Sequence, residues 1–305
     1  MRVLRGILLA HALSAARATA ATAAGAQEPA RTNRIGMEFV LIRPGSMVVG
    51  RFQPACPTPA PVGSRRDAVD AVDVRARWTP EDYRRCEEMV KRDALPGFTV
   101  HIRRPYYIGK YEVTQAQWRR VMGTNPSVFQ GSKVDGDADR HPVDNVTWED
   151  AQAFLRKLNR MDRTARYRLP TEFEWEYAAR AGAERDLTWA QIREQAQLAL
   201  VDKGTTQPVG GKQPNAWGLY DTLGNVWEWV QDYYNEKLFA DPTPPRTGTE
   251  HVLRGGSFLS DVKNTTYFTH GAGPGSGFDV GFRVVREVRE GGESRRGSRA
   301  ASAPP

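Results

Sequence analysis

The sequence predicts an α+β fold that forms one loop-rich domain. Threonines that can cap helices mark the starts of three short helices, and short apolar runs between turns predict strands around them. The 305 residues include 28 Gly and 20 Pro, which predicts many turns and few long helices. Hydrophobic residues make up 40% of the chain, enough for a sizeable core. A membrane-spanning helix needs roughly eighteen consecutive apolar residues, and the sequence contains no such run.

The first elements are predicted to be strands. Residues 36–49 alternate apolar and polar positions around Pro44-Gly45, which predicts an opening β-hairpin with Phe39 and Leu41 on one face. Residues 98–108 predict the next strand, with apolar residues bounded by Gly at either end.

Residues 51–97 are polar and contain several prolines, so they are predicted to be an insertion with one short helix that begins after Thr79. The only two cysteines of the chain, Cys56 and Cys86, lie in this insertion. In an exported protein such a pair predicts a disulfide, whereas in a reducing compartment both would be free thiols.

Three helices are each predicted to begin after a capping threonine: Thr114, Thr147 and Thr171. An acid stands at the capping-box position of the second and third: Asp150 and Glu174. Gly123 is expected to end the first helix and Gly182 the third. Beyond Gly182 the pattern favours loops, with two late strands over 253–258 and 281–285.

Both ends of the chain differ in composition from the middle. Residues 1–26 have a basic start, a short apolar stretch and a small-residue cleavage site, which predicts an export signal. Because His11 and Arg17 interrupt the apolar stretch, an alanine-rich disordered leader is the alternative. Residues 287–305 are rich in Gly, Ser, Arg and Pro and predict a disordered basic tail.

Most of the net charge of +7 lies in these two ends. The leader contributes +3 from three arginines, and the segment from Val288 contributes four arginines against two glutamates, which leaves +2 for the body. This small excess argues against a nucleic-acid-binding surface.

The segment 218–229 places Asp221 and Glu228 seven residues apart around Gly224 and between bulky aromatic residues. Calcium prefers carboxylate and carbonyl oxygens in a tight loop, which a glycine turn can provide. This pattern fits a calcium site. The alternative is an ordinary turn in which Asp221 caps the loop and Glu228 is solvated.

Six further segments occur in a fixed order along the chain: 36–40, 107–114, 141–148, 167–178, 253–257 and 281–285. Together with 218–229, this set closely resembles the formylglycine-generating enzyme (sulfatase-modifying factor) family over residues 35–286. The resemblance implies a C-type-lectin-like fold with long irregular segments. It also implies a structural calcium ion, held by the side chains of Asp221 and Glu228 and the carbonyls of Gly224 and Val226.

Enzymes of this family that generate formylglycine carry two cysteines after the Gly-Gly-Ser motif, and these thiolates bind copper(I). The resemblance places the two positions at Ser260 and Thr265, where hydroxyls cannot replace soft thiolates. Copper therefore has no ligands there. We expect an exported, calcium-stabilised binding or scaffold protein, which would bind a protein or small-molecule ligand with the loop 260–279.

The alternative is an oxidoreductase of the same family, similar to the formylglycine-generating or the siderophore-maturation members, on an unknown substrate. Its non-heme metal, such as iron, would need His251 or His270 together with a distant partner. The charged residues around 168–176 suit either an active cleft or a buried ion-pair network, and we predict the network. Arg254 and Arg283 are likewise predicted to form internal salt bridges.

Overall fold

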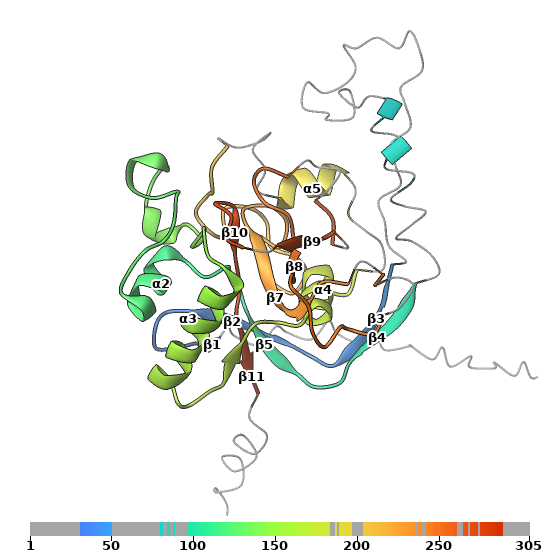
Figure 1. Cartoon of the computed structure of the whole chain (residues 1–305), viewed down its shortest axis with the longest axis horizontal. Coiled ribbons are helices and arrows are strands. Elements are labelled where there is room, and N and C mark those ends of the chain that lie inside the picture. The colour runs from blue at the N-terminus through green and yellow to red at the C-terminus, as the bar shows by residue number, and fades with distance from the viewer. Residues whose placement is uncertain are drawn as a thin grey trace, which may run out of the picture.

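The computed structural model describes thirteen parts of the chain (Figure 1): 31–50, 80–81, 84–85, 88, 97–183, 187, 189–196, 204–235, 237–238, 242–260, 265–267, 269–273 and 275–288. The predicted export signal, both cysteines, most of the insertion and the tail after 288 lie outside the described residues. None of the helices in the described parts is long and apolar enough to cross a membrane.

A five-stranded antiparallel sheet joins the two ends of the domain. Its spatial order is β1 (Arg31–Thr32), β2 (Glu38–Ile42), β5 (Tyr106–Gly109), β11 (Val285–Glu287) and β6 (Tyr167–Arg168). The last strand among the described residues, β11, lies between β5 and β6, so residues near 285 pack beside residues near 107. The late segment just before β11 is thereby brought to the centre of the molecule.

A four-stranded sheet carries the late segments. Its order is β10 (Val280–Gly281), β7 (Trp227–Tyr233), β8 (His251–Arg254) and β9 (His270–Gly273). β10 runs parallel to β7, whereas β7, β8 and β9 are antiparallel to one another. The calcium-loop segment leads into β7, and the Gly-Gly-Ser motif directly follows β8.

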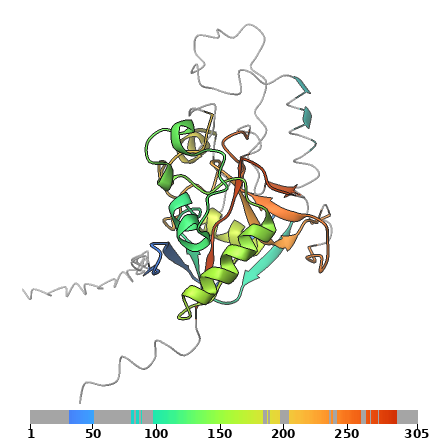
Figure 2. The same cartoon turned by 60° about the vertical axis from the view of Figure 1, so that its left-hand side comes forward.

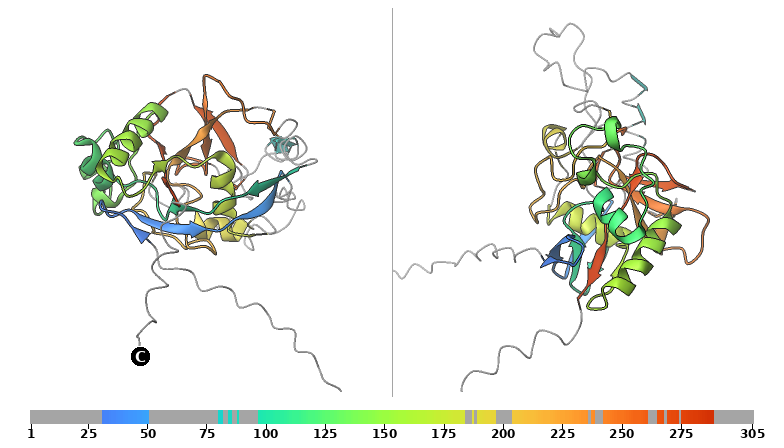
Figure 3. Two further views of the ribbon diagram at one scale, coloured as in Figure 1. Left: turned by 90° about the horizontal axis from the view of Figure 1, so that it is seen from below. Right: turned by 90° about the vertical axis from the view of Figure 1, so that its left-hand side faces the viewer.

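The predicted hairpin over 36–49 is wrong. β2 pairs with β1 and β5, while β3 (Gly45–Val49) pairs with β4 (Phe98–Ile102) in a separate ribbon, visible in blue and teal in Figure 3. The predicted strand 98–108 divides into β4 and β5. This break lies opposite the bend that separates β2 from β3. Pro44 and Pro105 lie in this bend. Neither proline has an N–H group, so the hydrogen-bond ladder is interrupted on both sides of the strand pair at the same point.

The N-terminal caps of the three main helices are confirmed. The helices are α2 (Gln115–Met122), α3 (Trp148–Met161) and α4 (Glu172–Arg180), and each has a complete capping box from its preceding threonine. Gly123 ends α2 as predicted, with φ of 85°. At the end of α4 both Ala181 and the expected Gly182 have positive φ, of 50° and 79°, and Ala181 is the C-cap. A shorter helix α5 spans Trp189–Gln195, and two 3-10 turns span Gly131–Lys133 and Ala138–Arg140.

The two late strands differ from the prediction. The first ends at Arg254, because Gly255 and Gly256 have φ of 88° and 75° and turn the chain out of the sheet. The second is divided into β10 and β11 by residues 282–284.

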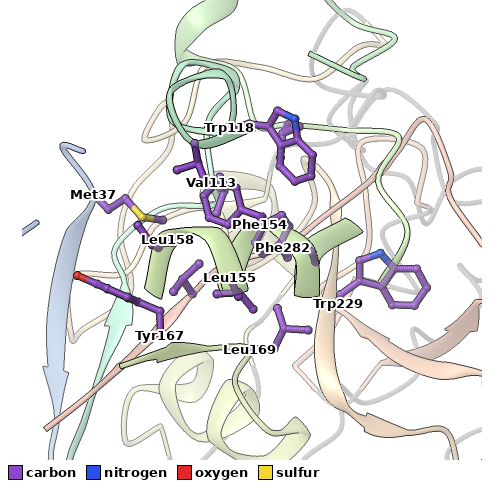
Figure 4. Close-up of a cluster of buried hydrophobic side chains, with 14 of the residues drawn as sticks. Met37, Val113, Trp118, Phe154, Leu155, Leu158, Tyr167, Leu169, Trp229 and Phe282 are labelled. Carbon is purple, nitrogen blue, oxygen red and sulfur yellow. The ribbon is translucent and has the colours of Figure 1, made fainter. Parts of the chain in front are cut away.

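The main core lies between the helices and the two larger sheets. Trp118 stacks on Phe154 with ring centroids 5.4 Å apart, and Phe282 meets both rings edge-on. Figure 4 shows these side chains converging with those of the other elements, and Figure 2 shows α2 and α3 adjacent on one side of the domain. Phe282 thus fixes the late segment against the first two helices, and Arg283 follows it directly.

Candidate functional site

The hydroxyls of Ser260 and Thr265 face the same glycine. A Cβ atom on Gly256 would lie 3.0 Å from Ser260 Oγ and 3.6 Å from Thr265 Oγ1. Ser260 Oγ also accepts a hydrogen bond of 2.9 Å from the backbone N–H of Ser257, which holds the turn closed. Thr265 is fully buried and Ser260 is half-buried. The structure therefore brings the two sequence-predicted positions together beside one turn.

The carboxylate of Asp279 stabilises the turn that begins at Ser257. Ser257 Oγ donates a hydrogen bond of 2.7 Å to Asp279 Oδ2 and accepts one of 3.2 Å from the N–H of Leu259. Asp144 is near enough for the charge of Asp279 to raise its pKa, and it accepts hydrogen bonds from the N–H groups of Val128 (2.6 Å) and Phe129 (3.3 Å). Sequence reasoning missed both aspartates as parts of this site, because no local pattern links 144 to 279.

Apolar side chains flank the hydroxyl pair. Leu259 is 52% exposed and Phe278 is 47% exposed, and they are two of the three large hydrophobic side chains that are exposed in the described residues. Phe129 connects Phe278 to the interior, since the ring of Phe129 lies 5.2 Å from that of Phe258 and 6.1 Å from that of Phe278, edge-on in both cases. We call Leu259, Phe278 and Phe129 the apolar rim.

Asp144 makes a testable contribution to the pH dependence of stability. Burial is the main reason that its pKa is raised from 3.8 to about 6 in the folded protein. The folded state then holds a proton that the unfolded state releases, so stability falls as the pH rises from about 4 to about 6. Asp144→Asn should flatten this part of the profile by up to about 3 kcal/mol. Urea unfolding at both ends of the window measures the effect, and an unchanged slope would contradict it.

An ion-pair network around α4 confirms the structural interpretation of its charges. Arg168 binds Glu174 through two hydrogen bonds of 2.6 and 2.7 Å and also reaches Glu287 at 3.1 Å. Glu174 is the capping-box residue of α4, so this pair connects the start of the helix to β6 and β11.

The network continues into the interior through Arg254. Its guanidinium binds Glu176 and lies 3.3 Å from Glu172, and it donates to the carbonyl of Tyr267 at 2.6 Å. Glu176 also accepts hydrogen bonds of 2.6 and 2.8 Å from Arg180. Arg254 immediately precedes the Gly-Gly turn and Tyr267 lies two residues after Thr265. The network therefore holds both ends of the segment that carries the hydroxyl pair.

Arg283 is the centre of a second buried cluster. It binds both carboxylate oxygens of Glu228 at 2.6 Å. Its remaining donors reach the carbonyls of Gly109 (3.2 Å), Tyr220 (3.0 Å) and Asp221 (3.3 Å). Glu228 also accepts a hydrogen bond of 2.7 Å from the indole of Trp175. The prediction that Arg283 forms an internal salt bridge is confirmed.

Acids outnumber bases in this cluster. Glu112, Asp221 and Glu228 are each at most 2% exposed, and Arg283 lies among them. Burial, followed by the charges of Asp221 and Glu228, raises the pKa of Glu112 well above its usual range. The carboxylate of Glu112 accepts hydrogen bonds from Asn225 Nδ2 at 2.9 Å and from the N–H of Val226 at 3.3 Å. The raised pKa favours the neutral form of Glu112, and a cation beside Asp221 and Glu228 would offset the remaining excess of carboxylates over guanidiniums.

A calcium ion held by the loop would be such a cation. Asp221, Gly224 and Asn225 all have positive φ, of 53°, 79° and 59°, so the chain is tightly wound between the two predicted acidic ligands. Glu228 already accepts three hydrogen bonds, which leaves one of its roughly four lone-pair positions for a metal. Within the described parts, no three His, Cys, Asp or Glu side chains form a metal site. Carbonyl ligands such as those of Gly224 and Val226 would therefore be required.

The two histidines considered for iron lie on opposite faces of the four-stranded sheet. Arg254 pairs with His270, whereas His251 is three residues from Arg254 along β8, and side chains alternate along a strand. His251 stacks between Trp148 and Tyr233, with centroids 3.8 and 4.4 Å away. His270 Nδ1 lies 3.2 Å from Glu172 Oε1. The described residues therefore do not bring both histidines to one metal.

Comparison with solved structures confirms the fold. The chain superposes on Treponema denticola variable protein 1 with a TM-score of 0.65 and 25% identity, covering 85% of this chain and 99% of the other. PvdO from Pseudomonas aeruginosa gives a TM-score of 0.63 at 21% identity, covering 87% of this chain and all of that one. The expected α+β fold of the formylglycine-generating-enzyme type, C-type-lectin-like and rich in irregular structure, is thus observed.

Sequence comparison gives the family. The formylglycine-generating enzyme of Streptomyces coelicolor is 38% identical over 176 residues, about half of each chain (51% of both). The chaperone protein LppX of Paenibacillus barcinonensis is 30% identical over 240 residues, covering 59% of this chain and 80% of LppX. Residues 25–288 match the family described as the sulfatase-modifying factor enzyme 1-like domain. The chain therefore belongs to the sulfatase-modifying factor (formylglycine-generating enzyme) family.

Proposed function

We propose that this chain is an exported, calcium-stabilised member of the family that acts as a binding or scaffold module without copper-dependent formylglycine-generating activity. The observation that carries the proposal is the convergence of Ser260 and Thr265 on Gly256. The family resemblance places copper-binding thiolates at these two positions, and here both are hydroxyls.

The donor atoms at positions 260 and 265 decide whether copper(I) can bind there. Copper(I) is a soft ion that selects thiolate and thioether ligands, whereas Ser and Thr hydroxyls are hard, weak donors at neutral pH. The chain has only two cysteines, Cys56 and Cys86, and both precede the site by more than 150 residues of sequence. With export, these two cysteines are proposed to form a disulfide in the insertion.

The apolar rim supports a binding role. Exposed Leu259 and Phe278 lie beside a turn that is held by buried hydrogen bonds and ion pairs. We therefore expect the backbone under the apolar rim to be rigid. Exposed large apolar side chains beside such a turn could contact a partner. LppX, whose length is mostly covered by the match, is described as a chaperone, which favours a polypeptide as the bound partner.

An oxidation assay tests the catalytic half of the proposal. The purified chain would be incubated aerobically with copper(I) and a cysteine-containing sulfatase peptide, beside an active formylglycine-generating enzyme. We expect mass spectrometry to find aldehyde only with the active enzyme. Aldehyde formed by this chain would overturn the proposal.

The alternative of an oxidoreductase on another substrate predicts a different metal content. Elemental analysis of protein purified without chelator discriminates between the two functions. Calcium alone supports the binding module, whereas stoichiometric iron or copper supports the enzyme.

Calcium should contribute measurably to stability. The ion would be held by the carboxylates of Asp221 and Glu228 and the carbonyls of Gly224 and Val226, and would offset the excess of buried carboxylates. At a calcium concentration ~100 times the dissociation constant, binding adds about 2.7 kcal/mol to the free energy of unfolding. EDTA should therefore lower the melting temperature by several degrees, and Asp221→Ala should abolish this difference. An unchanged melting temperature of the wild type in EDTA would refute the assignment.

A further inference from the structure

A separate cavity lies at the C-terminal ends of α2 and α3, on elements that do not contribute to the hydroxyl pair. Its volume is about 150 Å³. Apolar side chains form most of its wall: Ile35, Leu158 and Met161. Ile35 and Leu158 are buried, whereas Met161 is 45% exposed. Three charged side chains and one amide complete the lining: Arg34, Arg120, Asp162 and Asn33. We call this cavity the Arg34–Arg120 pocket.

Both arginines of the pocket are available to a ligand. Arg34 and Arg120 are exposed, and neither makes a hydrogen bond or an ion pair with another of the described residues. The charge of Arg34 lies near enough to Asp162 to help lower the pKa of that carboxyl. Two arginines in the lining of a mainly apolar cavity combine groups that bind carboxylates with a surface that can bury an apolar body.

Asp162 sets the charge that the pocket can accept. Its carboxylate accepts a hydrogen bond of 3.0 Å from the N–H of Thr164 and one of 2.7 Å from the hydroxyl of Tyr167. Burial opposes ionisation, but these hydrogen bonds outweigh it and lower the pKa of Asp162. Two positive charges and one negative charge leave a net charge of +1. A ligand with a single negative charge would balance it.

We propose that the Arg34–Arg120 pocket binds a monocarboxylate with a small branched or ring-shaped apolar body. The planar fork of an arginine matches the two oxygens of a carboxylate, which a point charge does not. An apolar cavity of about 150 Å³ has room for a group the size of benzene. The carboxylate of the ligand would lie between the two guanidinium groups. Its apolar body would pack against Leu158 and Ile35. This binding is independent of the function proposed for the hydroxyl pair.

Calorimetric titration of the full chain with 4-methylpentanoate tests the proposal. We expect saturable binding of one equivalent, and binding of 4-methylpentanamide and of acetate weaker by roughly tenfold or more, since each lacks one of the two recognised groups. Arg34→Gln and Arg120→Gln should each weaken the acid by a similar factor. Arg119→Gln is the matched control, because Arg119 lies on the same helix but is paired with Asp139.

The proposal fails if the acid does not saturate, if the amide binds as tightly as the acid, or if Arg119→Gln loses as much affinity as the pocket variants. Peptides ending in Leu, with a free or an amidated C-terminus, separate two sources of the same chemistry. Tighter binding of the free-carboxylate peptide than of the small acid would identify a polypeptide terminus as the ligand. Tighter binding of the small acid would identify a free carboxylate.

Discussion

Arg283→Met is expected to destabilise the protein by about 3–5 kcal/mol, since it removes the guanidinium that binds Glu228 and leaves buried carboxylates uncompensated. The arginine also donates to three backbone carbonyls, which would lose their partner. Urea unfolding followed by tryptophan fluorescence would measure the loss. Because such a variant can fail to fold, Arg283→Lys provides a second measurement. Lysine keeps the positive charge but lacks the planar guanidinium group, so the loss of stability should be intermediate.

Two features distinguish this effect from the loss of any surface arginine. Arg166→Met is the matched control: Arg166 lies 3.8 Å from Glu287 and is 76% exposed, so its removal should change stability by no more than ~0.5 kcal/mol. The loss in Arg283→Met should also shrink as the pH falls, because protonation removes the charge of the stranded acids and Glu112 already has a raised pKa. Equal stabilities of the two variants would contradict the role given to Arg283.

Ser260→Cys together with Thr265→Cys is expected to create a copper(I) site. Both side chains face Gly256, so two thiolates introduced there would approach the same point. Soft thiolates select copper(I), and the paired variant should bind it more tightly than the parent by on the order of a hundredfold or more, about 2.7 kcal/mol. An anaerobic titration against a chromophoric copper(I) chelator would measure the gain.

The controls for this variant use the cysteines that the chain already has. Replacing Cys56 and Cys86 with Ser removes native thiols from the measurement. Each single substitution at 260 or 265 should bind far more weakly than the pair, because one thiolate leaves the ion without its second soft ligand. Equal binding by a single substitution and the pair would show that the two positions do not converge.

Local chemistry made some of the fold predictable. Thr114, Thr147 and Thr171 each satisfy the free N–H groups of the helix that follows, and this needs no information from distant residues. The hairpin over 36–49 failed for the opposite reason: the alternation of apolar residues identifies strands but not their partners. Here both faces of β2 are buried, with Phe39 in one core cluster and Val40 in another.

The candidate site was predictable only where residues lie close in sequence or where the family resemblance supplied positions. Asp221 and Glu228 lie seven residues apart in sequence and were predicted together as calcium ligands, which stays a prediction. Glu112 was missed because its contacts with Asn225 and Val226 span more than a hundred residues of sequence. Motif spacing alone could not show that Ser260 and Thr265 meet over Gly256, since the turn depends on the positive φ of two glycines.

The most direct test of the central claim is a copper(I) titration of the chain with its native Ser260 and Thr265, carried out without oxygen and with Cys56 and Cys86 replaced by Ser. We predict that all of the copper stays with the competing chelator, because hydroxyls face Gly256 where thiolates would be required. Tight binding of one equivalent of copper(I) by this protein would show that the hydroxyl pair does not exclude copper.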